Sequence, residues 1–138
     1  MAEVKTRPTG EDADAFLAAI PDDRRRSDAR TICKLLARVT GDPAVMWGKA
    51  MVGFGLRYLH YDSGRELDTL IIGLSPRKTS TTLHLPDGCA THADLLVRLG
   101  PHTTRGSCLY IKRLADVDAA VLEDLVTRSV TAVRTSPA

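Results

Sequence analysis

The chain has 138 residues, of which 43% are hydrophobic and 26% are charged. This length suits one domain, and the composition is that of a folded globular protein, which excludes an intrinsically disordered chain. The 19 basic and 17 acidic side chains give a formal net charge of +2, which is too small to indicate nucleic-acid or membrane binding by itself.

The chain begins with a polar stretch, residues 1–10, that we predict to be an N-terminal arm. The folded domain is predicted at 11–134, and 135–138 are expected to form a tail. No segment approaches the roughly 18 consecutive apolar residues of a membrane span, and the N-terminus lacks the apolar core of a secretory signal. We therefore expect a cytoplasmic protein that does not enter a membrane.

Two helices are predicted in the first third of the chain. Residues 11–19 begin with three acids, where negative charge complements the helix dipole, and Pro21 interrupts this helix. Residues 22–40 repeat apolar side chains at helical spacing and stop before Gly41. The three successive arginines at 24–26 lie mostly off the apolar stripe, so we interpret them as a solvated face.

The middle of the chain has an apolar period of two, which indicates β-strands. The turn sequence Asp62-Ser63-Gly64-Arg65 separates strands predicted at 54–61 and 67–73, so we expect an antiparallel hairpin there. A second turn precedes a strand at 80–85. These strands together predict an antiparallel meander.

Three more elements are predicted in the C-terminal part. Thr91 and Asp94 resemble a capping box for a short helix that ends at Gly100. Residues 107–112 are predicted to form a strand, and Asp116 is the expected N-cap of a final amphipathic helix. The whole pattern predicts an α+β fold, with an antiparallel sheet of about five strands packed with helices in a two-layer sandwich.

The sequence contains none of the common motifs for nucleotide binding, zinc proteolysis or serine hydrolysis, so no enzyme class has positive support. Its three cysteines form no CxxC pair, which indicates reduced thiols rather than a disulfide framework or a thiolate zinc site. Cys108 has basic neighbours, and it could act as a nucleophile or redox sensor if it is exposed and close to His102 or Lys112. A cysteine-dependent enzyme is therefore a third alternative.

Basic and hydroxyl side chains are concentrated in the turn at 75–78 and in the segment that leads into the strand at 107–112. On a strand, Cys108, Tyr110 and Lys112 share one face. If these segments converge, they form a cationic pocket suited to phosphate or carboxylate. The alternative is that the cations are solvated or paired with local acids. The candidate ligand-binding residues are Arg77, Lys78, His102, Arg105, Cys108, Tyr110 and Lys112.

The longest distinctive motifs are Gly73-Leu74-Ser75-Pro76-Arg77-Lys78 and Gly106-Ser107-Cys108-Leu109-Tyr110-Ile111-Lys112-Arg113-Leu114, accompanied by Trp47-Gly48, Val52-Gly53-Phe54-Gly55 and Ser63-Gly64-Arg65-Glu66. Together they closely resemble the YdhG-like family, long catalogued as a domain of unknown function. The resemblance covers roughly residues 11–130. It implies a compact α+β sandwich, and one branch of the family is similar to frataxin, with helices packed on one face of an antiparallel sheet.

The frataxin-like branch is regarded as an intracellular iron chaperone for iron–sulfur cluster or haem assembly. The resemblance therefore implies Fe(II) as a ligand and iron–sulfur or haem assembly proteins as partners. Carboxylate oxygens near the first helix would hold the ion; the candidates are Glu11, Asp12, Asp14, Asp22 and Asp23, with His60 or His84 as additions. The same acids are also explained as helix-start residues that complement the dipole.

Two functions from different classes are therefore left open. The first is the iron-binding chaperone that the resemblance implies. The alternative is a non-enzymatic module that binds an anionic small molecule, or an acidic partner surface, through the basic pocket. Nucleic-acid binding is not expected, because one tryptophan offers no series of stacking platforms. A homodimer through an exposed sheet edge is compatible with the sequence.

Overall fold

The structure of the protein is a computed structural model that describes residues 12–48, 50–55, 57–60 and 66–135. The predicted N-terminal arm, the candidate metal ligand Glu11 and the predicted turn at 62–65 lie outside these residues. Of the predicted tail, only Thr135 is described, as the last residue of a helix. No helix in the described ranges is long and apolar enough to cross a membrane.

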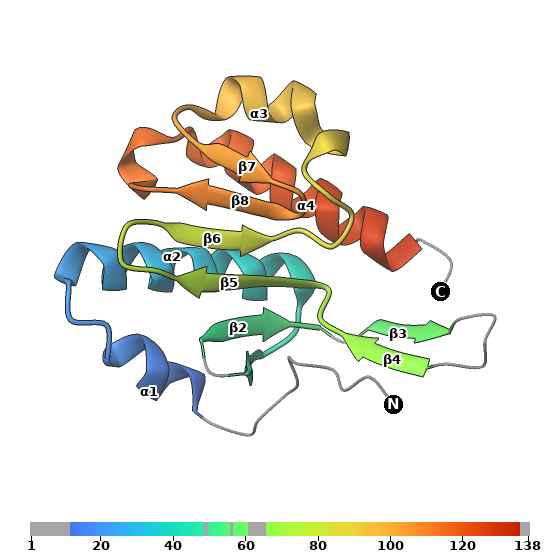
Figure 1. Ribbon diagram of the computed structural model, residues 1–138, viewed down its shortest axis with the longest axis horizontal. Coiled ribbons are helices and arrows are strands. Elements are labelled where there is room, and N and C mark those ends of the chain that lie inside the picture. Colours follow the sequence, from blue (N-terminus) through green and yellow to red (C-terminus); the bar gives the residue numbers. More distant parts are fainter. Residues whose placement is uncertain (1–11, 49, 56, 61–65, 136–138) are drawn as a thin grey trace.

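The described residues form four α-helices and two short 3-10 turns (Figure 1). The helices are α1 (Ala13–Ala18), α2 (Asp23–Thr40), α3 (Ala93–Leu99) and α4 (Ala119–Thr135), and the turns are η1 (Ala90–His92) and η2 (Leu114–Asp116). Asp12 begins α1 by accepting the N–H groups of Asp14 and Ala15, and Asp22 begins α2 in the same way. Gly41, with a φ of 74°, ends α2.

Six strands form one antiparallel sheet in the order β1-β2-β5-β6-β8-β7, and β3 pairs only with β4 in a separate hairpin. The strands are β1 (Ala44–Trp47), β2 (Met51–Phe54), β3 (Arg57–His60), β4 (Glu66–Thr69), β5 (Ile72–Pro76), β6 (Thr81–His84), β7 (Thr103–Arg105) and β8 (Cys108–Ile111). The hairpin is inserted between β2 and β5. The sheet is therefore a meander at one end, while α3 separates β6 from β7 and β8 in the sequence.

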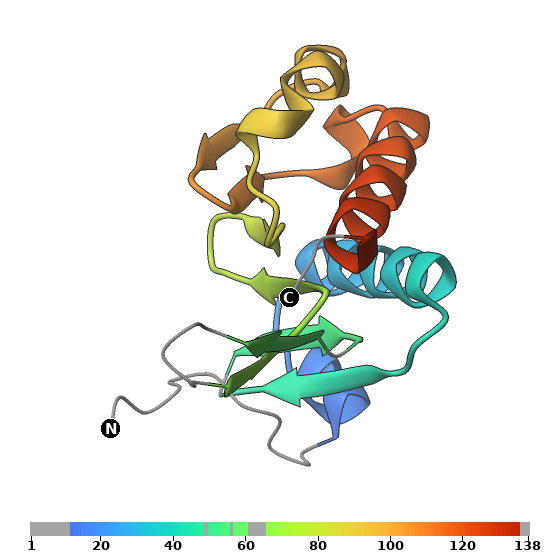
Figure 2. The same cartoon turned by 90° about the vertical axis from the view of Figure 1, so that its right-hand side faces the viewer.

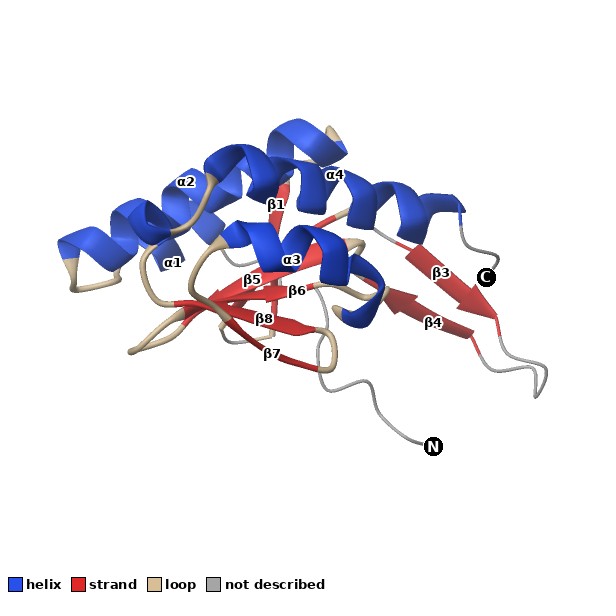
Figure 3. Ribbon diagram, turned by 90° about the horizontal axis from the view of Figure 1, so that it is seen from above, coloured by secondary structure: helices blue, strands red, loops and turns tan. Residues whose placement is uncertain are grey.

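The hydrophobic core lies between one face of the sheet and the helices. Alternation along the strands directs Phe54, Leu74, Leu83 and Leu109 to this face, where all four are fully buried. Helix α2 contacts β2, β5 and β6 and also packs against α4. Figures 2 and 3 show α2 and α4 covering the same side of the sheet. The opposite face is not covered by these helices and carries the candidate site.

Apolar side chains cover the β1-β2 end of the open face. Gly53 and Gly73 are cross-strand partners in β2 and β5. A Cβ atom at Gly53 would collide with the ring of Trp47, and one at Gly73 would lie 3.1 Å from a methyl group of Leu70. The two glycines thus make room for Trp47 and Leu70, both buried. Polar residues occupy the rest of this face.

The predicted α+β class and the antiparallel sheet packed with helices are confirmed, although the main sheet has six strands rather than about five. The strand predicted at 67–73 is divided, because β4 ends at Thr69 and β5 begins at Ile72. A strand not predicted, β7, pairs with β8. The final helix also extends to Thr135, the first residue of the predicted tail, and Arg134 donates to Thr40 and Asp42.

Two predicted helix caps are wrong. The hydroxyl of Thr91 donates to the carbonyl oxygen of Gly88 at 3.2 Å, so it makes no capping box with Asp94. Asp116 belongs to η2, and Asp118 is the residue whose carboxylate accepts the first N–H groups of α4, at 2.9 and 3.2 Å. In both cases the residue that the pattern assigned to the cap lies in the 3-10 turn that precedes the helix.

Candidate functional site

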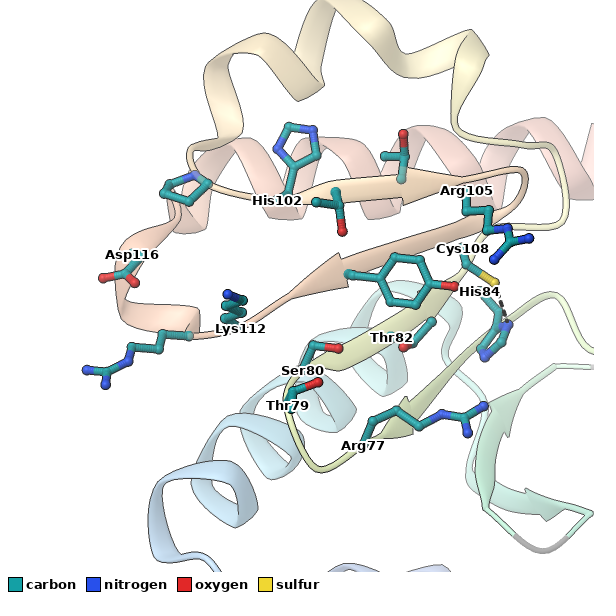
Figure 4. A pocket seen from close by; sticks show the side chains of 15 residues that line it. Arg77, Thr79, Ser80, Thr82, His84, His102, Arg105, Cys108, Lys112 and Asp116 are labelled. Carbon is teal, nitrogen blue, oxygen red and sulfur yellow. Dashed lines mark hydrogen bonds between the residues drawn. The ribbon is translucent and has the colours of Figure 1, made fainter.

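A hollow of about 920 Å³ lies on the open face, across β6, β8 and β7 and beside the turn that follows β5 (Figure 4). Its floor is formed by the strand positions that alternate with the core-facing ones, including Thr82 and His84 of β6 and Cys108 and Tyr110 of β8. The loops at the ends of these strands supply the rim. The lining residues are Arg77, Thr79, Ser80, Thr82, His84, Pro101, His102, Thr103, Thr104, Arg105, Cys108, Tyr110, Lys112, Arg113 and Asp116.

The hollow is cationic and rich in hydroxyl groups. Arg77, Arg105, Lys112 and Arg113 line it together with a single carboxylate, that of Asp116. Among the ion pairs between described residues, none involves any of these four cations. Their donors therefore face the hollow and solvent without a described carboxylate partner, which favours an anionic ligand.

His84 connects two other side chains at one end of the hollow. Its Nδ1 atom lies 3.7 Å from Cys108 Sγ, and its Nε2 atom lies 3.1 Å from Ser75 Oγ. Burial, and after it the positive charge of Arg77, lowers the pKa of His84 from its ordinary value of 6.5. The imidazole is therefore neutral at pH 7, with one nitrogen free to accept a proton.

The hydroxyl of Thr82 is the buried polar group of the hollow that has no partner. The residue is 2% exposed, and Oγ1 makes no hydrogen bond to the described residues. Thr82 precedes His84 by two positions on β6, so both side chains project from the same face of the sheet. An unpaired buried hydroxyl is costly unless a ligand or water supplies the missing partner.

Two arginines at the start of α2 donate hydrogen bonds to the backbone of segments that form the rim of the hollow. Arg24 donates to the carbonyl oxygen of Lys112 at 3.0 Å, and Arg25 donates to that of Arg77 at 2.7 Å. The carboxylate of Asp28 accepts from Arg24 and from the N–H of Leu114. The interpretation of this run as a merely solvated face is therefore incomplete, because two of its members anchor the loops that carry the cations.

The structure brings six of the seven predicted ligand-binding residues into the one hollow: Arg77, His102, Arg105, Cys108, Tyr110 and Lys112. Lys78 is exposed in the turn after β5 and does not line it. His102 is not the partner of Cys108, because its Nδ1 atom lies 2.7 Å from the carbonyl oxygen of Gly100.

Several residues of the site were not among the predicted ligand-binding residues, and three of them, Ser75, Thr82 and His84, lie around the contact with Cys108. The sequence predicts His84 only as an additional iron ligand and no individual role for Ser75 or Thr82. The period-two pattern of β6 places Thr82 and His84 opposite the buried Leu83 and Leu85, and this was the available signal. Their closeness to Cys108 depends on strand pairing, which the pattern does not reveal.

The acidic candidates do not form a cluster in the described part of the chain. Asp12 and Asp22 each accept two backbone N–H groups at a helix start, and Asp23 pairs with Arg26. The N–H of Arg25, followed by that of Arg24, lowers the pKa of Asp22. No group of three or more His, Cys, Asp or Glu residues within the described ranges is placed to hold a metal ion. The iron-chaperone function stays a prediction.

The other two thiols differ from Cys108 in their surroundings. Burial, together with the charge of Asp14, raises the pKa of Cys33 to about 12. Cys89 is 4% exposed, and burial raises its pKa as well. A thiol that stays protonated is a poor nucleophile. Of the three cysteines, Cys108 is the one that is partly exposed and lines the hollow.

Comparison of the chain with protein-family models, with curated proteins and with solved structures gave no match. The resemblance to YdhG-like and frataxin-like proteins therefore stays a prediction, and the function is argued from the geometry of the site.

The depressed pKa of His84 gives a direct test of that geometry. We expect the imidazole signals of His84 to titrate in NMR spectra with a midpoint below 6.5. Arg77→Ala removes the second of the two causes, so the midpoint should rise while burial keeps it below 6.5. Arg98→Ala, an exposed change on α3, should leave it unchanged. An identical midpoint in Arg77→Ala would show that the guanidinium does not reach His84.

Proposed function

We propose that the open face of the sheet is a binding site for a small molecule that carries a phosphate or carboxylate group. The observation that carries this proposal is the charge of the hollow: three arginines, Arg77, Arg105 and Arg113, and Lys112 line it, against the single carboxylate of Asp116. A guanidinium fork matches both anions, and surrounding hydroxyl groups supply further donors.

The shape of the hollow favours a small molecule over a macromolecule. Its volume of about 920 Å³ is near the upper end of typical ligand pockets. Tyr110 is the single aromatic residue among those that line it, and single-stranded nucleic acids are usually bound by several stacking platforms. Figure 4 shows Arg77 and Arg105 on either side of His84, with Lys112 further along the hollow. An anion held between the two arginines would contact the floor of the sheet.

The proposal is tested by titration with inorganic phosphate and, separately, with succinate, followed by amide chemical shifts at low ionic strength. We expect saturable shifts at β5, β6 and β8, and affinity that falls as sodium chloride is added. Arg77→Ala and Arg105→Ala should each weaken binding at least tenfold, since a charge-assisted hydrogen bond contributes about 1.5–3 kcal/mol. Comparison of the two titrations decides between phosphate and carboxylate.

A matched control separates the site from the general charge of the protein. Arg98→Ala also removes one positive charge, but Arg98 is exposed on α3 and does not line the hollow. It should leave phosphate binding nearly unchanged. Equal weakening by Arg98→Ala and Arg77→Ala, or the absence of shifts at the three strands with both anions, would contradict the proposal.

A further inference from the structure

Adjacent strands bring a thiol, an imidazole and a hydroxyl into one line on the open face. Cys108 of β8 and His84 of β6 are directly opposed across the sheet, and Ser75 lies on β5, the next strand. Their polar atoms are separated by 3.7 Å from sulfur to Nδ1 and by 3.1 Å from Nε2 to the hydroxyl oxygen. A neutral imidazole carries one N–H, so one nitrogen donates and the other accepts; the tautomer with Nε2–H donates to Ser75 and leaves Nδ1 to accept from the thiol. Figure 4 shows this contact at the end of the hollow where Arg105 also lies.

We propose that Cys108 is a catalytic nucleophile, with His84 as its general base, and that it attacks the carbonyl carbon of an ester or thioester. The anionic character of that substrate rests on the proposed function, because the cations of the hollow would hold its phosphate or carboxylate group. The thiol and imidazole pair does not depend on the anion. Nucleophile, base and orienting hydroxyl have the arrangement that activates a thiol.

The chemical step moves one proton and exchanges one bond. The sulfur forms a bond to the carbonyl carbon while the thiol proton passes to Nδ1 of His84. The negative charge on the carbonyl oxygen then re-forms the double bond, the bond to the leaving oxygen or sulfur breaks, and that atom takes the proton from His84. The products are an S-acylated Cys108 and a free alcohol or thiol, and water completes the cycle by hydrolysing the acyl group.

Thr82 points to acyl chemistry independently of the thiol. Its hydroxyl is buried without a partner, lines the same hollow and projects beside His84. The charge that develops on a carbonyl oxygen during acyl transfer needs a fixed hydrogen-bond donor in a site with little water. A hydroxyl that no described residue uses can supply this donor, and the guanidinium of Arg105 adds positive charge on the same side.

The experiment uses p-nitrophenyl acetate, a neutral ester, and measures acetylation of each cysteine by peptide mass spectrometry. We expect Cys108 to be acetylated at least tenfold faster than N-acetylcysteine at pH 7, and the buried Cys33 and Cys89 to serve as slow internal controls. His84→Gln should slow acetylation of Cys108 at least tenfold, since a general base contributes about 10²–10⁴ in rate. The rate in the unaltered protein should also fall as His84 is protonated below pH 6.5, whereas the slower rate in His84→Gln should follow only the ionisation of the thiol, with no break at the pKa of His84.

Two further variants keep the test interpretable. Cys108→Ser removes the nucleophile and should abolish the adduct at that position, while circular dichroism verifies that both variants fold. Thr82→Val keeps the shape of the side chain but removes the donor, so it should lower the acetylation rate without changing its pH dependence. A Cys108 that reacts no faster than N-acetylcysteine, or a rate that His84→Gln leaves unchanged, would overturn the proposal.

The experiments distinguish an error in the proposed anion site from an error in the proposed nucleophile. Because the ester is neutral, fast acetylation of Cys108 without phosphate or succinate binding would sustain the nucleophile and reject the anion site. Anion binding together with an unreactive Cys108 would sustain the anion site and reject the nucleophile. When both are present, bound phosphate should slow acetylation of Cys108 by occupying the same hollow, and acetylation unaffected by saturating phosphate would reject the shared site.

Discussion

Replacing Asp87 by alanine should destabilise the protein more than the loss of any exposed ion pair. The carboxylate lies in the loop after β6, where one oxygen accepts from the hydroxyl of Ser129 and the other contacts Nε2 of His92, both at 2.6 Å. Ser129 is 0% exposed and His92 is 1% exposed, so the change leaves both buried side chains without this partner. We expect the free energy of unfolding to fall by about 3 kcal/mol, since each stranded buried group costs roughly 1–3 kcal/mol.

The matched control for this change is Asp94→Ala. Asp94 forms a two-pronged ion pair with Arg128, at 2.8 and 3.0 Å, but both side chains are largely exposed. Such pairs are screened by solvent, so its removal should change the urea midpoint far less. Asp87→Asn retains an oxygen for Ser129 and should fall between the two. If Asp87→Ala unfolds at the same urea concentration as Asp94→Ala, the buried network does not stabilise the junction of this loop with α4.

The regular elements could be predicted because each is encoded in consecutive residues. The helices expected at 11–19 and 22–40 correspond to α1 and α2, and the hairpin expected after residue 54 corresponds to β3 and β4. The caps could not be assigned, because Asp116 and Asp118 are equally suitable by residue type. The N–H of Asp118 donates to the carbonyl oxygen of Leu99 at 2.8 Å, and this tertiary contact fixes where α4 begins.

The candidate site could be predicted only in part, for a related reason. The composition of the 99–114 segment indicated a cationic surface, and alternation placed Cys108, Tyr110 and Lys112 on one face. Which histidine lies next to Cys108 could not be predicted, because this depends on strand order. Strand β8 pairs with β6, and α3 and β7 lie between these two strands in the sequence. His102, nearer in the sequence, turns to its own backbone, while His84 is opposite the thiol.

Alanine at Gly100 should be the most damaging of the glycine substitutions near the site. Gly100 ends α3 with φ 114° and ψ −164°, a conformation that side chains disfavour. A Cβ atom there would lie 2.8 Å from the carbonyl oxygen of Asp116 and 3.3 Å from the Cα of Val117, and both are backbone atoms that cannot rotate away. We expect a loss of roughly 3 kcal/mol or more in the free energy of unfolding, from strain and from overpacking together.

Gly106→Ala is the comparison without a collision, because Gly106 also has a positive φ, 61°, but a Cβ atom there would meet nothing within 4 Å. It should cost about 1–2 kcal/mol, the penalty for a left-handed residue alone. The difference between the two urea midpoints measures the collision with Asp116 and Val117 together with the additional strain of the φ 114°, ψ −164° conformation. Since Pro101 and Asp116 both line the hollow, relief of that collision would have to displace its rim. Gly100→Ala should therefore also weaken phosphate binding, whereas equal stability of the two variants would mean that η2 moves aside without cost.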